Sequence, residues 1–594
     1  MYPLTQPISC SRLSRLGAVC LLAFSATTGA TGISVDAPDD LRELILRHAN
    51  SLRSPPERTA PEEVQASPPR DEQAERQARV RQARQEILPL LETEGYFSAR
   101  VSAVPGPDGE ITLKVTPGQR TEIKEVRIEI RGALSDDSPG YAERRQTLEK
   151  QWRLPVGQAF RQADWSSAKD ALLNSISERD FAAAKIVEST ADIDPIRSAA
   201  RLHIVIDSGP PFFLGELEVS GLNLYSRELV ERYNTLKPGE AYDYNRLVAL
   251  QNALQATPFF GAAIVEIDRD PDTAKATPVH VRLTEAPPKR LGTGLGYSTN
   301  TGLRTEVNYR DANILGQAWE LNSSLRLEQK RQSAFADLFF PQTATRFRNA
   351  IGAAALSEDI SNLKTTRWAV GTTRIRTLNK TEVRLNLNYQ RETTEPAGGQ
   401  KTETKAFTLN YGADLRNVDN PTDPQSGMVL GFQIGGGTKT FLSDQNFLRL
   451  YGHAQYFQPL GSQSTLLLRG EAGYTIANSR NGIPQDFLFR TGGAQTVRGY
   501  NYQSLGVQDG NAIVGGRTLF ISSVEYINWF QAPWGAAVFV DAGNAADTWK
   551  AMTLKVGSGF GGRWRSPAGP LGLDLAWGKG DPRPKVHFSI SFIF

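Results

Sequence analysis

A glycine-rich segment near the C-terminus carries the residue best suited to specific chemistry. Phe489 to Tyr500 reads FRTGGAQTVRGY, and it ends in Val497, Arg498, Gly499 and Tyr500. Glycine adopts backbone angles that other residues avoid, so the segment predicts a tight, irregular loop. A guanidinium held on such a loop needs a carboxylate partner, and a bidentate pair would pin the loop in place. The chemistry predicted here is recognition of a carboxylate within the protein.

Acidic residues that could serve as this partner follow on strand-like segments. Asp541 lies in VFVDAG, Glu525 lies in SVEY, and Asp574 lies in LDL. Alternation of apolar and polar residues puts such carboxylates on one face of a strand. For any one of these segments taken alone, an ordinary strand with a polar face stays the alternative.

Enzyme sites are not indicated. The five histidines are scattered without metal-ligand spacing, and no G-x-S-x-G elbow is present. Gly294 and Gly296 belong to a strand rather than a phosphate loop, because no helix pattern follows them. We therefore expect no catalytic activity, no metal and no cofactor.

The segments that must position the loop lie in residues 288–594, where apolar residues alternate with small or polar residues at a period of two. The first strand of this region contains Leu291, Gly292, Thr293, Gly294, Leu295, Gly296 and Tyr297. The last strand places on one face Val586, Phe588, Ile590, Phe592 and Phe594. An apolar face toward lipid and a small or polar face toward water is the pattern of a membrane strand.

The length of this region predicts a 16-stranded antiparallel transmembrane β-barrel. Residues 289–594 allow about 19 residues for each strand with its connection, which suits membrane strands of about 9–11 residues. The first and last strands would meet at a seam. Because glycine weakens strand pairing, we expect the glycine-rich first strand to make that seam easy to open.

Residues 33–288 contain an internal repeat in which a helix ends at an aromatic corner and a strand follows. Phe97 and Phe181 are 84 residues apart, and Phe181 and Phe260 are 79 apart. The unit reads as β-α-α-β-β, with one apolar helix stripe on a small sheet, and its opening strand is readable in the second and third copies. We place the units at 33–118, 119–209 and 210–287. The first unit is divergent, with a proline-rich insert at 54–69 that we expect to be an exposed loop. Three generic α+β domains without a shared role are the alternative.

The N-terminus reads as a secretion signal over residues 1–30. Arg12 and Arg15 precede an apolar core from Leu16 to Ala26, and Thr28-Gly29-Ala30 resembles a cleavage site. A lipoprotein signal around Cys20 is a weaker alternative. Both cysteines of the chain lie in this segment, so we expect no disulfide in the mature protein.

The net charge of +3 is spread over interspersed acids and bases, so nucleic acid is not an expected partner.

These features together resemble the POTRA-plus-barrel insertase superfamily, the bacterial surface antigen family. The three repeats resemble POTRA domains, and Val497 to Tyr500 matches the V-R-G-[FY] signature of the family's inward-folded loop. Val538 to Gly543 matches its F-x-D-x-G motif, and Gly557 to Leu571 matches the glycine-rich block that follows. The resemblance implies that Asp541 is the first candidate to accept Arg498, with Glu525 and Asp574 as further candidates. A final aromatic at Phe594 resembles the signal by which outer-membrane barrels are recognised for insertion.

Three repeats are similar in number to those of TamA-like assembly factors within this superfamily. That resemblance implies an outer-membrane protein, with its repeats in the periplasm, that inserts or translocates β-barrel or autotransporter-type clients. It also implies a TamB-like inner-membrane-anchored partner, unfolded client proteins and contact with outer-membrane lipid. Two alternatives stay open: a two-partner-type secretion pore for one dedicated exoprotein, and a passive solute porin.

Overall fold

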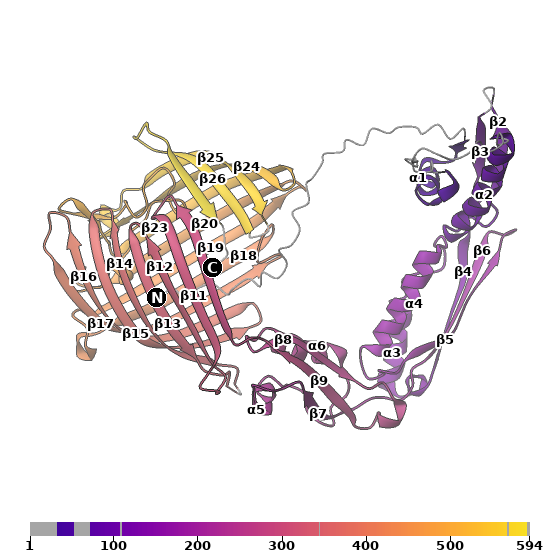
Figure 1. The fold of residues 1–594 in the computed structure, drawn as a ribbon, viewed down its shortest axis with the longest axis horizontal. Coiled ribbons are helices and arrows are strands. Elements are labelled where there is room, and N and C mark those ends of the chain that lie inside the picture. The colour runs from indigo at the N-terminus through magenta and orange to yellow at the C-terminus, as the bar shows by residue number, and fades with distance from the viewer. Residues whose placement is uncertain (1–32, 53–71, 107–109, 344, 567–568, 591–594) are drawn as a thin grey trace, which may run out of the picture.

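The computed structural model describes residues 33–52, 72–106, 110–343, 345–566 and 569–590. An arm of three small α+β domains leads into a large β-barrel (Figure 1). This architecture confirms the predicted fold class, three α+β domains followed by a 16-stranded antiparallel barrel. The predicted signal (1–30), the proline-rich insert (54–69), Phe592 and Phe594 lie outside the described residues.

Each arm domain has the same topology, β-α-α-β-β, around a three-stranded sheet. The first contains β1 (Ile33–Asp36), α1 (Asp39–His48), α2 (Glu72–Thr93), β2 (Arg100–Pro105) and β3 (Ile111–Thr116). The second contains β4 (Glu122–Arg131), α3 (Pro139–Lys150), α4 (Gln162–Ser177), β5 (Lys185–Asp194) and β6 (Ala199–Asp207). The third contains β7 (Leu214–Ser220), α5 (Arg227–Glu231), α6 (Tyr244–Gln255), β8 (Phe260–Ile267) and β9 (Thr277–Glu285).

The sheet order is also shared. The last strand of each domain lies in the middle, parallel to the opening strand and antiparallel to the remaining one. The first domain opens with the four-residue strand β1, which the sequence did not reveal because so short a segment carries no readable period.

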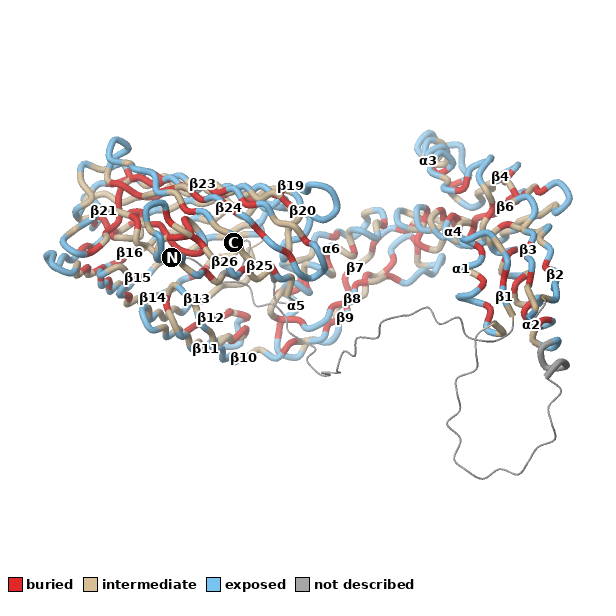
Figure 2. The backbone as a smooth tube through the Cα atoms, turned by 90° about the horizontal axis from the view of Figure 1, so that it is seen from above, coloured by how far each residue is buried: buried red, intermediate tan, exposed pale blue. Residues whose placement is uncertain are grey.

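The longer helix of each domain buries one stripe against its sheet. In α4, for example, Trp165, Ala168, Leu172 and Ile176 are buried, at the three- and four-residue spacing that places side chains on one helix face. Figure 2 shows these buried segments running through the middle of the arm. No helix in the described part of the chain is long and apolar enough to cross a membrane.

The first two aromatic corners of the repeat lie at the joints between domains. At the first joint, Thr121 N donates to Gly95 O at 2.8 Å, and the ring of Phe97 lies 5.9 Å from that of Phe160. At the second joint, Asp180 N donates to Tyr242 O at 2.9 Å, and Phe212 N donates to Asp180 O at 2.6 Å. The recurring corner therefore connects each of these domains to the next.

The third domain packs directly against the barrel. Its hydrophobic core includes Tyr225 and Leu229 and extends to Ala312, near the end of the second barrel strand, and to Ala318, just before the third. The N–H of Ala312 donates to Pro288 O at 2.8 Å, which fixes the chain where it enters the barrel. The arm and the first strands of the barrel thus share one core.

Sixteen antiparallel strands form the barrel wall, each paired with its neighbours in chain order. They are β10 (Lys289–Ser298), β11 (Gly302–Ile314), β12 (Trp319–Glu328), β13 (Arg331–Phe339), β14 (Arg348–Ile360), β15 (Leu363–Leu378), β16 (Thr381–Pro396), β17 (Thr402–Val418), β18 (Gly427–Gly437), β19 (Phe447–Leu460), β20 (Ser464–Ile476), β23 (Thr518–Gln531), β24 (Trp534–Ala546), β25 (Lys555–Ser566), β26 (Gly569–Gly578) and β27 (Lys585–Ile590). The chain enters β10 from the arm, so β10 runs away from the arm side. Each following strand reverses direction, so β11, β13, β15, β17 and β19 run toward the arm side.

The first and last strands form a seam without a hydrogen-bonded ladder over the described residues. β10 pairs with β11 along its whole length, and β27 pairs with β26. The one hydrogen bond joining the two sides of the seam in the described part runs from Phe588 N to Thr299 Oγ1 at 3.5 Å. The sequence predicted that these strands would close the barrel against each other. Over the described residues β10 and β27 do not pair, and three glycines leave β10 with few side chains to hold the edge.

Candidate functional site

The glycine-rich segment lies in the long connection between β20 and β23, residues 477–517. This connection contains the short hairpin β21 (Val507–Asp509) and β22 (Ala512–Val514), and it is bridged to itself at Phe489 and Gly516. Val497 is fully buried in a cluster with Phe489 and Leu505 of the loop and with Leu519 and Ile521 of β23. The loop is therefore folded inward against the barrel wall.

Arg498 is the best-connected residue of this loop. Its side chain is 2% exposed, and its Nε and Nη2 donate to the two oxygens of Asp541 at 2.7 and 2.9 Å. Its Nη1 donates to Glu525 at 2.7 Å and to Asp574 at 3.0 Å. The guanidinium carbon also lies 3.3 Å from the ring centre of Phe539. The three carboxylates named from the sequence are the three that contact Arg498.

A second arginine completes the cluster. Arg563 of β25 donates to Glu525 Oε1 from Nε at 3.0 Å and from Nη2 at 2.7 Å, and from Nη1 to Asp574 Oδ1 at 2.5 Å. Asp541 also accepts from Ser523 Oγ at 2.7 Å. Because all three carboxylates are nearly or fully buried, paired arginines and hydrogen bonds are needed to offset the cost of removing them from water.

The remaining motif residues attach the loop to the last strands. Gly499 has φ +88°, and a Cβ there would lie 2.5 Å from the backbone N of Gly578. Its N–H donates to His587 Nε2 at 3.0 Å, and its carbonyl accepts from Lys585 Nζ at 3.0 Å. The hydroxyl of Tyr500 donates to Val556 O at 3.3 Å. Only glycine fits at position 499, because the backbone angle and the close approach both exclude a side chain.

The other end of the loop is attached to strands β14, β15 and β16 of the barrel wall. Arg490 Nη2 forms an ion pair with Glu358 of β14 at 3.2 Å. The N–H of Gln485 donates to Glu392 Oε1 of β16 at 2.7 Å, and Arg367 of β15 pairs with both Glu392 and the loop residue Asp486. The loop thus connects β14–β16 to β23–β27 through the inside of the barrel.

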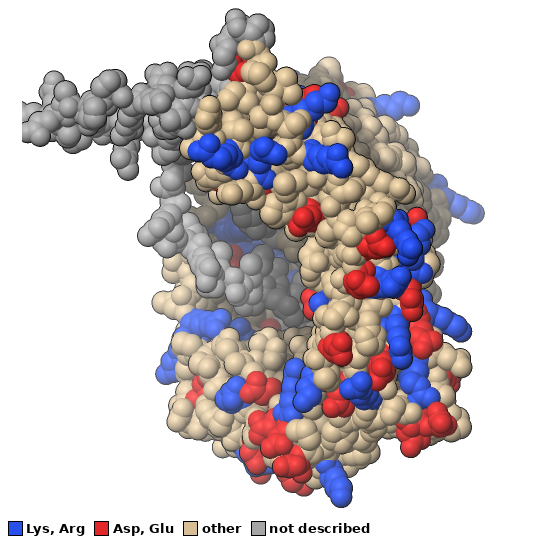
Figure 3. Space-filling model, turned by 90° about the vertical axis from the view of Figure 1, so that its right-hand side faces the viewer, with Lys and Arg blue, Asp and Glu red and all other residues tan. Residues whose placement is uncertain are grey.

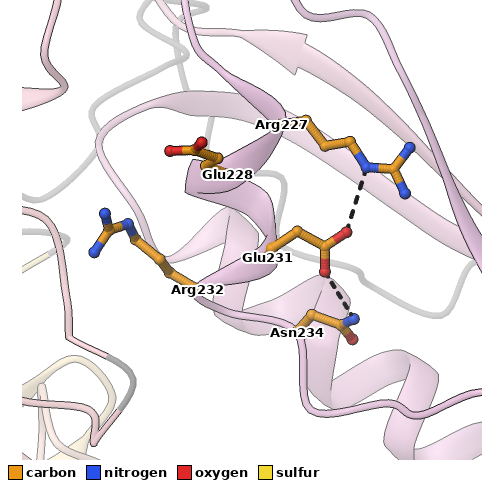
Figure 4. A pocket seen from close by; sticks show the side chains of 5 residues that line it. All are labelled: Arg227, Glu228, Glu231, Arg232 and Asn234. Atoms are coloured by element: carbon orange, nitrogen blue, oxygen red, sulfur yellow. Dashed lines mark hydrogen bonds and ion pairs between the residues drawn. The ribbon is translucent and has the colours of Figure 1, made fainter.

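The joint between arm and barrel carries an open pocket lined by charged and amide side chains. Arg227, Glu228, Glu231, Arg232 and Asn234 line it, on and just after α5. Figure 4 shows Arg227 and Asn234 turned toward Glu231, while Arg232 points away from them. Arg232 Nη1 donates to Gln342 O, in the connection between β13 and β14, at 3.4 Å. The pocket is open and of mixed charge, and it marks a contact between α5 and the barrel rim.

The structure brings together all the predicted loop and carboxylate residues, and it adds others. Arg563 and His587 were missed as cluster members. Arg563 stands in the glycine-rich block after Gly557 and could have been found from its place on the inward face of a strand. Among the predicted seam residues, Leu291, Gly292, Gly294 and Gly296 lie on β10 and Phe588 lies on β27.

Comparisons with known proteins agree with this architecture. Residues 288–594 match the Omp85 superfamily domain. The chain is 24% identical over 415 residues to the outer membrane protein assembly factor BamA of Nitratidesulfovibrio vulgaris, covering 65% of this chain and 52% of that protein. The chain thus spans about half the length of this curated relative.

A solved BamA structure is similar in fold, and a solved CdiB structure superposes less well. BamA from Haemophilus ducreyi lacking POTRA domains 1–3 superposes with a TM-score of 0.64 at 16% identity, covering 79% of this chain and 98% of that one. CdiB from Acinetobacter baumannii gives a TM-score of 0.43 at 13% identity, covering 79% of this chain and 89% of that one.

The fold and site define an outer-membrane β-barrel whose lumen holds an arginine-pinned loop and whose arm of α+β domains lies in the periplasm. The family match covers more than half of the chain. The protein belongs to the Omp85 superfamily.

Proposed function

We propose that this protein inserts or exports β-barrel or autotransporter-type clients through the seam between β10 and β27, and that it does so without enzymatic chemistry of its own. The observation that carries the proposal is the edge of β10, which has no ladder partner other than β11 in the described residues. An unpaired strand edge offers backbone donors and acceptors to an incoming strand.

The side chains of β10 favour the same role. Leu291 is 71% exposed and Leu295 is 87% exposed, while glycines occupy the alternate positions. A client strand could therefore add to this edge with little steric hindrance. The folding of the client supplies the driving force, since the chain carries no recognised nucleotide-binding motif.

The arm offers further strand edges. In the second domain β5 is an edge strand, and its Val187 is 53% exposed. The face of the molecule at the arm end carries acidic and basic side chains side by side (Figure 3). We propose that the arm holds unfolded clients, or a TamB-like partner anchored in the inner membrane, by strand addition at such edges rather than by net charge.

The inward loop argues against a passive porin. A solute pore needs an open lumen, and here the loop crosses the interior from β14–β16 to the last strands. An assembly factor does not need an open lumen, because its clients enter the membrane laterally through the seam.

A reversible lock on the seam tests the proposal. Cysteines placed at Tyr297 or Ser298 and at Phe588 would be screened for disulfide formation, in a chain with Cys10 and Cys20 replaced by serine. The matched control joins Ala353 and Val370, which already face each other across β14 and β15, away from the seam. We expect the oxidised seam variant to lose client assembly and to regain it with reductant, while the control stays active.

If the fully cross-linked seam supports normal assembly, lateral opening is the wrong mechanism. Export of a client through the locked barrel would favour a two-partner-type secretion pore instead.

A further inference from the structure

A pair of arginines stands on the outer wall of the barrel, close to the periplasmic end of β15. Arg374 and Arg376 are two residues apart on this strand and therefore point to the same side. Their neighbours across the sheet include Leu385, opposite Arg374, and Val383, opposite Arg376. Leu385 is 43% exposed on the lipid-facing surface. The two arginines thus lie on the membrane side of the wall.

Their depth corresponds to the periplasmic leaflet. β15 is the sixth barrel strand, so it runs toward the arm and ends at Leu378. Arg376 and Arg374 lie two and four residues before that end. At roughly 3.3 Å of rise per residue along a tilted strand, both arginines are within about 15 Å of the strand end. The exposed apolar residues Val370 and Ile351 lie farther from that end, at the level of the hydrocarbon.

Both guanidinium groups gather at a single aromatic ring. The Cζ of Arg374 lies 4.7 Å and the Cζ of Arg376 lies 5.1 Å from the ring centre of Phe347, which directly precedes β14. The two guanidinium carbons therefore lie at most about 10 Å apart. Arg374 is also oriented by its Nε, which donates to Asn349 Oδ1 at 3.0 Å.

No carboxylate of the described chain lies within ion-pair distance of either arginine, although most other arginines of the barrel have one. The Nε of Arg376 is buried and has no hydrogen-bond partner among the described residues. Like charges at such close range repel, and the low dielectric of the membrane interface strengthens the repulsion. An anion between them would relieve the repulsion and accept the unused N–H groups.

We propose that Arg374 and Arg376 bind the phosphate of an anionic phospholipid in the periplasmic leaflet. The planar guanidinium fork matches phosphate oxygens in a bidentate manner. Asn349 and Phe347 hold the fork in place, and the acyl chains lie along the apolar wall above it. Arginines that only extend toward water to escape the hydrocarbon would need neither a shared ring nor an orienting amide.

The test measures lipid retained by the full-length protein. Wild-type protein is purified in mild detergent with phosphatidylglycerol added, and bound lipid is counted by native mass spectrometry. R374Q/R376Q removes both charges at nearly constant volume. K364Q/K405Q is the matched control. It also removes two outward-facing cations, but these lie near the starts of β15 and β17, at the end of the barrel away from Arg374 and Arg376. Heat-modifiable electrophoretic mobility verifies that each barrel is folded.

We expect wild type and K364Q/K405Q to retain one phosphatidylglycerol, and R374Q/R376Q to bind it about tenfold or more weakly, the scale of losing charge-assisted hydrogen bonds. R374K/R376K keeps the charge without the fork, and we expect it to retain an intermediate amount. Equal retention by wild type and R374Q/R376Q overturns the proposal.

Two further measurements separate the possible sources of the anion and do not depend on a variant that folds. With wild-type protein, phosphatidylcholine should be retained less than phosphatidylglycerol, and equal retention contradicts the proposal. Inorganic phosphate added in excess should not displace the lipid. Displacement would show that the arginines bind free phosphate rather than a lipid.

Discussion

Replacing Arg498 with alanine tests the lock that holds the inward loop. The substitution removes four side-chain hydrogen bonds, two to Asp541, one to Glu525 and one to Asp574. The losses are unequal. Glu525 and Asp574 keep Arg563, whereas Asp541 keeps Ser523 Oγ, the backbone N–H of residue 498 and a distant arginine, Arg469, at 3.9 Å.

The magnitude follows from this partial compensation. Removing one partner of a buried ion pair costs roughly 3–5 kcal/mol, because it leaves a buried charge uncompensated. Since Arg563 remains for two of the three carboxylates, we place the cost at about 3 kcal/mol. At 1.4 kcal/mol for each factor of ten, this shifts the equilibrium between docked and released loop by roughly a hundredfold.

The assay is limited proteolysis of residues 477–517 in the inserted barrel, followed alongside client assembly. When loop opening and closing are fast relative to cleavage, the cleavage rate follows the population of the open form. We therefore expect R498A to be cleaved roughly a hundredfold faster and to assemble clients poorly while its barrel still inserts. R565A is the matched control, because Arg565 pairs with Asp423, in the connection between β17 and β18.

A second variant separates the ion-pair argument from loss of side-chain volume. R498A/D541N removes the uncompensated charge as well as the cation, so its loop should be more resistant than that of R498A. Wild-type resistance and assembly in R498A, or no recovery in R498A/D541N, would refute the reasoning.

Three further predictions concern the loop, the terminus and the arm. G499A should insert yet release the loop, because a Cβ would lie 2.5 Å from the backbone of Gly578 at a φ of +88°; a loop as protease-resistant as wild type would contradict this. Deleting Phe594 should lower the amount of inserted barrel more than its specific activity, and unchanged membrane levels would show that the final aromatic is incidental. E94Q should loosen the first joint of the arm, because Glu94 accepts from Arg161 at 2.8 and 3.0 Å. Since Arg161 is 42% exposed, the cost is about 1 kcal/mol or less, and small-angle scattering indistinguishable from wild type would rule out a role in the joint.

Local patterns predicted much of the architecture. The helix that precedes each aromatic corner was readable because apolar residues recur at helical spacing. The helix before the second corner, for example, is α4, Gln162–Ser177. The barrel was predictable because a membrane wall makes lipid-facing and lumen-facing residues alternate along every strand. This period of two is visible in the sequence itself. The short strand β1 was missed because four residues give no period.

The loop cluster was predictable only in part. Arg498 was identifiable from its glycine neighbours, and its carboxylates were identifiable from family-like motifs and strand patterns. The attachment of Arg490 to Glu358 was not, because it depends on which strands the loop reaches across the lumen. The pairing of Arg563 with the same carboxylates depends on the register of β23 to β26. The hydrogen bond from Gly499 to His587 likewise joins residues 88 positions apart.

The sequence by itself determined the order of the domains, the alternation of the barrel wall and the residue that pins the loop, because each is encoded in neighbouring positions. Only the tertiary structure decided that β10 and β27 stay unpaired, that Arg563 shares the carboxylates, and that Arg374 and Arg376 meet at one ring. These features depend on the register and closure of sixteen strands. Strand register and closure are set by the packing of residues far apart in the chain, which no local pattern records.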